Sequence, residues 1–189
     1  MFEFITLKIV YVTLHVFGVA IGAGAAYMND IIFMSSMKDR VLSSVEIRIL
    51  SLLSKVVWFG LGLLVVSGIL LFLLDPVTYS VSTKFLAKMT IVAVLLINGV
   101  VFHRAHLPLL KSIENKVLTN YSRFQKGSSL LVVSGAISIV SWSFAILFGV
   151  LRVIPYSYVT IMSVYVGVMC VAIGVALIVR KKFLARARV

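Results

Sequence analysis

ITLKIVYVTLHVFGVAIGAGAAYMNDII, residues 5–32, is the most informative run of this chain because it is apolar over nearly its whole length. As a helix rising about 1.5 Å per residue, it is long enough to cross the roughly 30 Å hydrocarbon core of a bilayer. One narrow side of that helix carries small and polar residues: Tyr11, His15, Gly18, Gly22, Ala26 and Asn29. Lipid chains gain nothing from a stripe of glycines, so this side is expected to face another helix or a flat cofactor.

The composition of the whole chain extends this interpretation. Of the 189 residues, 61% are hydrophobic and 13% are charged, and the mean hydropathy is +1.14. Soluble domains are about 45–50% apolar and about 25% charged. We therefore expect an all-α integral membrane protein with a single transmembrane domain over residues 1–189. The first run is too long for a cleaved signal peptide and is expected to remain as a permanent span.

Four further apolar runs are long enough to cross a bilayer, and charges or prolines separate them. The expected spans lie near residues 5–32, 47–74, 84–107, 128–151 and 156–179. The second helix is expected to begin outside the membrane, with Ser43 or Ser44 as its N-cap and Glu46 close behind. The sequence therefore predicts a five-transmembrane-helix bundle.

A net charge of +12 raises the question of nucleic acid, but the basic residues gather at the ends of the spans. One side of the bundle collects most of them, including the tail RKKFLARARV at residues 180–189, whereas the other side has Lys8, Lys84, Lys88 and Arg152. The positive-inside rule then predicts an outside N-terminus and a cytoplasmic C-terminus. We expect the lipid bilayer, and no nucleic acid, as a partner.

His15 is the leading candidate for a functional residue. It lies near the middle of the first run, about 16 Å below one membrane face at about 1.5 Å per residue. An ionisable side chain at that depth indicates a functional site. We interpret His15 as an axial ligand of a b-type haem, with Tyr11, Gly18 and Gly22 beside it on the same face.

Two cations and a methionine complete this candidate haem site. Lys88 lies about one turn below the outer surface, where it either snorkels to the headgroups or, with Arg152, pairs with haem propionates. Met162 or Met169 in the fifth span lies at a depth comparable to His15 and is a candidate sixth ligand. Methionines in membrane helices are, however, far more often packing residues.

His103 and His106 form a second histidine pair near the expected cytoplasmic boundary. Either they are an interfacial, solvated pair, which we favour, or they form an i, i+3 metal or haem site. Because His103 lies about 28 Å below the outer face by the same helical rise, it is not expected to share one haem with His15.

The acidic residues and the soluble-enzyme motifs exclude other classes of protein. Asp30 and Glu114 are expected at or near the inner membrane surface, so no carboxylate is expected in mid-membrane. A proton-coupled pump or carrier is therefore disfavoured. The sequence has no HExxH motif, no phosphate-binding glycine loop and no Ser-His-Asp set. Cys170 is the single cysteine, so no internal disulfide forms.

Three segments resemble a known family: LHVFGVAIGAGA at residues 14–25, SKVVWFGLGLLVVSGILLFL at 54–73 and FLAKMTIVAVLLINGVVFH at 85–103. They are similar to small bacterial membrane proteins of the copper-resistance-D and HemJ type, over roughly residues 8–107. HemJ-type proteins are described as haem-b-binding protoporphyrinogen oxidases, and His15 and Lys88 match their histidine and lysine. The resemblance implies a bacterial cytoplasmic (inner) membrane. The fifth span and the HRAH segment at residues 103–106 do not match the pattern of either type.

Three functions follow from these observations. The leading one is haem b binding for electron transfer or for oxidation of a lipophilic substrate such as a quinol or a porphyrinogen, with a quinone or another redox partner. An alternative is copper handling by His15 together with Met28, Met34, Met37 or His103 and His106 as metal ligands. The other alternative is a structural or assembly subunit whose small-residue faces pack on a second copy or on other membrane subunits.

Overall fold

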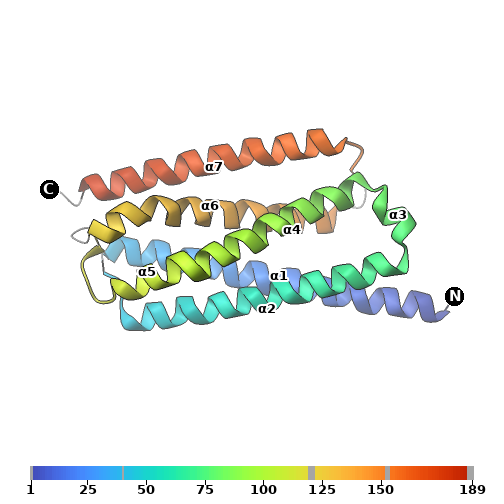
Figure 1. Cartoon of the computed structure of the whole chain (residues 1–189), viewed down its shortest axis with the longest axis horizontal. Helices are drawn as coiled ribbons and strands as arrows, with labels where there is room; N and C mark the ends of the chain where they lie inside the picture. The colour runs from blue at the N-terminus through green and yellow to red at the C-terminus, as the bar shows by residue number, and fades with distance from the viewer. Residues whose placement is uncertain (1, 40, 119–121, 152–153, 187–189) are drawn as a thin grey trace.

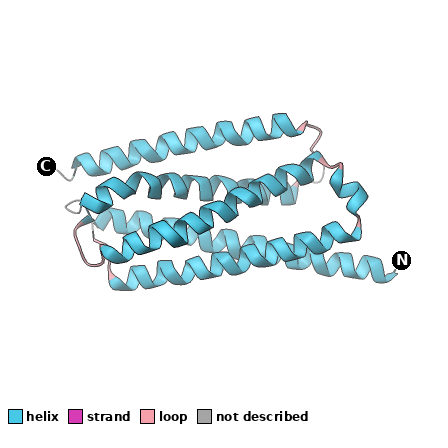
Figure 2. Cartoon of the chain, viewed as in Figure 1, coloured by secondary structure: helices cyan, strands magenta, loops and turns pink. Residues whose placement is uncertain are grey.

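In the computed structural model, residues 2–39, 41–118, 122–151 and 154–186 are described, and nearly all of them are helical (Figure 2). The elements are α1 Phe2–Asp39, α2 Ser44–Leu74, α3 Pro76–Ser80, α4 Thr83–Val101, the π-helical turn η1 Phe102–His106, α5 Leu107–Ser112, α6 Ser122–Val150 and α7 Tyr158–Arg186. Five segments are long and apolar enough to span a membrane: Ile5–Met37, Ser44–Leu74, Thr83–Ser112, Phe124–Val150 and Tyr158–Leu184. The prediction of an all-helical integral membrane protein with five spans is confirmed.

The long helices run roughly side by side, with α7 along one flank and α1 and α2 along the other (Figure 1). The most extensive contact is between α1 and α2, and α6 packs against α7, α4 and α1. We call the end of the bundle at which α1 and α7 finish the C-terminal end, and the opposite end the N-terminal end. The predicted orientation of these two ends across the membrane stays a prediction.

Ser43 starts α2 in the predicted way. Its hydroxyl accepts a hydrogen bond from the Glu46 amide at 3.2 Å, and the Glu46 carboxylate accepts one from the Ser43 amide at 2.8 Å. This reciprocal pair satisfies two backbone donors that a helix otherwise leaves open. Ser36 of α1 also donates to Glu46, so the same carboxylate ties the end of α1 to the start of α2.

Several helices extend beyond the predicted spans, and α1 and the third span are the clearest cases. α1 continues past residue 32 to Asp39, because Ser36 and Met37 are buried against the start of α2. The third span continues past Pro108, which lies in the first turn of α5. The π-helical turn η1 directly before it joins α4 to α5 without a break in the helical chain.

Candidate functional site

His15 lies on α1 with its ring against α2. Its Nδ1 atom is 3.1 Å from the Ser67 hydroxyl, and that hydroxyl donates to the Leu63 carbonyl oxygen at 2.6 Å. Since a serine hydroxyl has a single proton, and the Leu63 bond uses it, Nδ1 of His15 is the donor to Ser67. With this assignment Nε2 carries the lone pair of the ring, and the imidazole also makes a hydrogen bond to the Leu64 backbone.

A glycine makes room for this ring on α2. A Cβ atom placed on Gly68 would be 3.4 Å from Cε1 of His15, which is ordinary van der Waals contact, so a larger side chain would displace the imidazole. His15 itself is only partly buried. Tyr11, one turn earlier on α1, is also partly buried. The structure therefore combines a fixed ring orientation with access to one side of the ring.

Lys88 of α4 is the cation that the structure brings toward His15. The ammonium lies within electrostatic range of the imidazole, and the side chain is partly buried. In the described part of the chain, no carboxylate or hydrogen-bond acceptor pairs with Lys88. Lys84, one turn earlier, donates to the Leu151 carbonyl oxygen. The predicted second cation, Arg152, lies outside the described residues.

The glycine face of α1 is filled by protein. A Cβ on Gly18 would stand 2.7 Å from the backbone nitrogen of Leu64, and one on Gly22 would collide with the ring of Trp142. Gly60 of α2 likewise faces the Gly22 backbone directly, with 2.6 Å from its added Cβ to the Gly22 Cα. Of the two roles considered for Gly18 and Gly22, contact with a flat cofactor or with another helix, the structure supports helix packing.

The second histidine pair is split by η1. His103 is exposed, whereas His106 is 1% exposed and its ring meets Phe102 edge-on, with 5.8 Å between ring centroids. The prediction that both rings are solvated is wrong for His106, because its side chain is enclosed within the bundle. Nε2 of His106 is buried and has no hydrogen-bonding partner in the described residues.

The other candidate metal ligands are dispersed. Met169 lies on α7 and packs against the buried core that includes Trp142 and Tyr165. Its helix, α7, contacts mainly α6 and α4, whereas His15 faces α2. Over the described ranges, no three His, Cys, Asp or Glu side chains come together in a group that suits a metal ion. The structure thus brings Lys88 toward His15 but keeps His103, His106 and Met169 apart from it.

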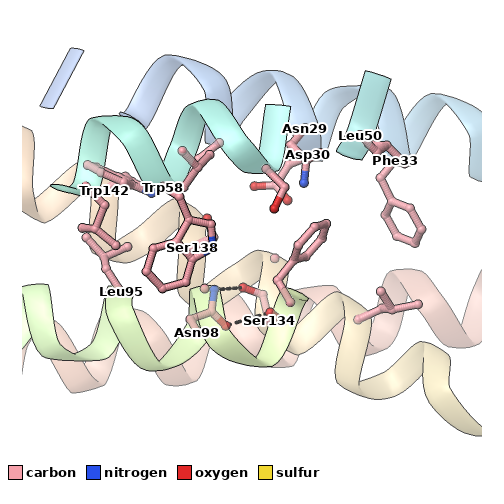
Figure 3. A pocket seen from close by; sticks show the side chains of 18 of the residues that line it. Asn29, Asp30, Phe33, Leu50, Trp58, Leu95, Asn98, Ser134, Ser138 and Trp142 are labelled. Carbon is pink, nitrogen blue, oxygen red and sulfur yellow. Dashed lines mark hydrogen bonds between the residues drawn. The ribbon is translucent and has the colours of Figure 1, made fainter. Parts of the chain in front are cut away.

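A polar cavity that the sequence analysis missed lies between α1, α2, α4 and α6. Its empty space, including its opening, is about 740 Å³. In Figure 3, Asn29 and Asp30 lie on one side and the hydrogen-bonded Asn98 and Ser134 lie across from them. The sequence analysis placed Asp30 at or near the inner membrane surface; in the structure α1 continues for two more turns beyond it, and Oδ2 of Asp30 is buried in the protein. The apolar residues 31–34 after Asp30 were the available signal.

Comparisons with protein families, curated proteins and solved structures gave no match for this chain. The class of protein therefore follows from its own fold: an all-helical integral membrane protein with five candidate spans in its described residues. Along α1, this protein carries two distinct polar features. One is the oriented His15 with Lys88 nearby, and the other is the cavity at Asp30, 15 residues or about 22 Å further along the helix.

Proposed function

We propose that this protein binds haem b within the membrane through Nε2 of His15 and uses it for electron transfer or for oxidation of a lipophilic substrate such as a quinol or a porphyrinogen. The observation that carries the proposal is the hydrogen bond from Nδ1 of His15 to Ser67. Histidines that ligate a metal almost always donate their other ring nitrogen to such an acceptor, which fixes the tautomer and the ring orientation.

The residues around His15 fit the chemistry of a haem. The imidazole of His15 supplies the nitrogen ligand that is usual for b-type haem iron. Lys88 supplies a cation that no described carboxylate neutralises, and a haem propionate is an anion that would pair with it. The resemblance to HemJ-type proteins, which rests on this same histidine and lysine, supports the same assignment.

The bound haem and the protein would then have separate roles. A bound haem supplies one-electron redox chemistry, which no side chain near His15 provides. The protein holds the imidazole through Ser67, positions the Lys88 charge, and fixes α1 against α2 by the close approach of Gly18 and Gly60. This close helix contact keeps the His15 backbone rigid relative to Ser67, which is what a precisely oriented ligand requires.

The two alternatives have less support from the geometry. The proposed structural or assembly subunit relied on a small-residue face open to partner helices, but Gly18 and Gly22 are already covered by α2 and Trp142 of the same chain. Copper handling relied on histidines and methionines acting together, yet Met28 and Met34 are exposed while Met37 is buried. These side chains therefore do not line one site.

The absorption spectrum of protein purified from haem-replete cells tests the proposal. Wild-type protein is expected to show a Soret band, and His15→Ala is expected to lose it because the axial nitrogen is gone. His103→Ala is the matched control, since it removes an exposed imidazole of the same chain at the other end of the bundle. A colourless wild-type preparation, or a band that survives in His15→Ala and disappears in His103→Ala, contradicts the assignment.

A further inference from the structure

The cavity at Asp30 is a separate feature that the haem proposal does not use. Its walls are of two kinds: polar side chains on α1, α2, α4 and α6, and aromatic rings on α1, α2, η1 and α6 (Figure 3). The aromatic residues are Phe33, Trp58, Phe102 and Trp142. Because it mixes a few polar groups with a largely apolar lining, it has the make-up of a small-molecule site.

Some polar groups of this cavity have hydrogen-bonding partners among the described residues, and others do not. Asn98 and Ser134 satisfy each other: the Asn98 amide donates to the Ser134 carbonyl oxygen at 3.1 Å, and the Ser134 hydroxyl donates to the Asn98 side-chain oxygen at 2.7 Å. Oδ1 of Asn29 and Oδ2 of Asp30 are buried and have no partner in the described part of the protein. Both of these atoms are acceptors in the ionised site, so the missing partner is a hydrogen-bond donor.

The charge of the cavity also favours a hydrogen-bond donor as the missing partner. No described lysine, arginine or histidine forms an ion pair with Asp30, and Lys55, the basic residue next to the cavity-lining Ser54, is exposed. A buried carboxylate without a counter-charge is costly in a low-dielectric interior. A partner that brings both a positive charge and N–H donors removes this cost.

The aromatic lining distinguishes an organic cation from a metal ion. Hard cations such as Mg²⁺ or Ca²⁺ are held by about six or more oxygen ligands, whereas the buried unpaired oxygens here belong to Asn29 and Asp30, with the hydroxyls of Ser54 and Ser138 on the same lining. Indole and phenyl faces attract ammonium groups and also cover an apolar body. We propose that the cavity binds a monovalent organic ammonium ion, with its N–H groups on Asp30 and Asn29 and its apolar part between Trp58 and Trp142.

Tryptophan emission tests this proposal directly, because Trp58 and Trp142 are the two tryptophans of the chain and both line the cavity. The probe is benzylammonium, added to full-length protein in lipid nanodiscs, with uncharged benzyl alcohol as its match in shape. We expect a saturable change in emission with benzylammonium and a rise in the thermal unfolding midpoint. Benzyl alcohol is expected to bind at least about tenfold more weakly, since it lacks the charge.

Three variants locate the effect. Asp30→Asn is expected to weaken benzylammonium binding at least about tenfold while leaving benzyl alcohol unchanged. Glu114→Gln is the matched control, because it neutralises an exposed carboxylate outside the cavity and is expected to change nothing. Should Asp30→Asn fail to fold, Asn29→Leu removes the second acceptor without changing the charge and is expected to weaken binding by a smaller factor.

Several outcomes overturn the proposal. Equal binding of benzylammonium and benzyl alcohol shows that the cavity does not recognise charge. Equal binding to wild type and Asp30→Asn places the probe elsewhere. Exchange of potassium for sodium at constant ionic strength is expected to leave binding unchanged, and displacement of the probe by sodium assigns the site to an inorganic cation. None of these results concerns His15, so the haem proposal is tested independently.

Discussion

Two parts of the same helix, α1, meet their neighbours in opposite ways. At Gly18 and Gly22, the side chain is reduced to hydrogen, and α2 and Trp142 approach to contact distance. Two turns later, at Asn29 and Asp30, polar side chains face α4 and α6 across a cavity. A closed contact next to an open one on a single rigid helix lets the protein hold His15 firmly while it keeps an accessible polar space elsewhere.

Opening the closed contact is expected to have the largest effect. Gly60→Leu places a side chain directly against the Gly22 backbone, where nothing can move aside except a whole helix. Overpacking of this kind costs about 3 kcal/mol or more. Gly62→Leu is the control on the same helix, since no atom lies within 4 Å of an added Cβ there. Unfolding of both variants in nanodiscs measures the difference, and equal destabilisation would contradict the packing described here.

Removing the hydrogen-bond acceptor that orients the His15 ring is expected to have an intermediate effect. Ser67→Ala removes the acceptor of the Nδ1 hydrogen bond but keeps His15 itself. Loss of such an outer partner typically lowers affinity by about 10–100-fold. Ser54→Ala is the control, because it removes another buried serine of α2 that does not contact His15. Haem affinity, measured by titration, is expected to fall only in Ser67→Ala, and an equal fall in both variants argues against a specific role for Ser67.

Neutralising Asp30 in the cavity is expected to have the smallest effect, and it is expected to stabilise the protein rather than weaken it. Asp30→Asn replaces a buried carboxylate that lacks a counter-charge by a neutral amide of the same shape. In the absence of any added cation, the free energy of unfolding is expected to rise by about 1 kcal/mol. Glu114→Gln, at an exposed position, is expected to change stability by less than about 0.5 kcal/mol. A loss of stability in Asp30→Asn would indicate that the carboxylate has a partner.

The features that depend on local sequence were predictable. Five long apolar runs gave the five spans, and Ser43 followed by Glu46 gave the start of α2, because a capping box is encoded within four residues. The stripe with Gly18 and Gly22 was recognised as a contact face. Its partner was left open, because a row of glycines admits a helix and a flat cofactor equally well until the neighbouring helix is known.

The features that depend on neighbouring helices or on irregular backbone were missed. Asp30 was not expected in a cavity, because the cavity forms only where α1, α2, α4 and α6 meet. His106 was expected to be solvated because it lies near the expected end of the third span, whereas it is 1% exposed and its ring meets Phe102. The hydrogen bond from His15 to Ser67 joins residues 52 positions apart, which no sequence periodicity reveals.

Titration of haem b into purified, haem-free protein in nanodiscs tests the central claim most directly. The claim is that haem binding belongs to His15 and not to the cavity at Asp30. The account predicts a saturable Soret band in wild type and in Asp30→Asn with equal affinity, and no saturable band in His15→Ala. Equal binding in wild type and His15→Ala, or loss of binding in Asp30→Asn alone, would contradict it.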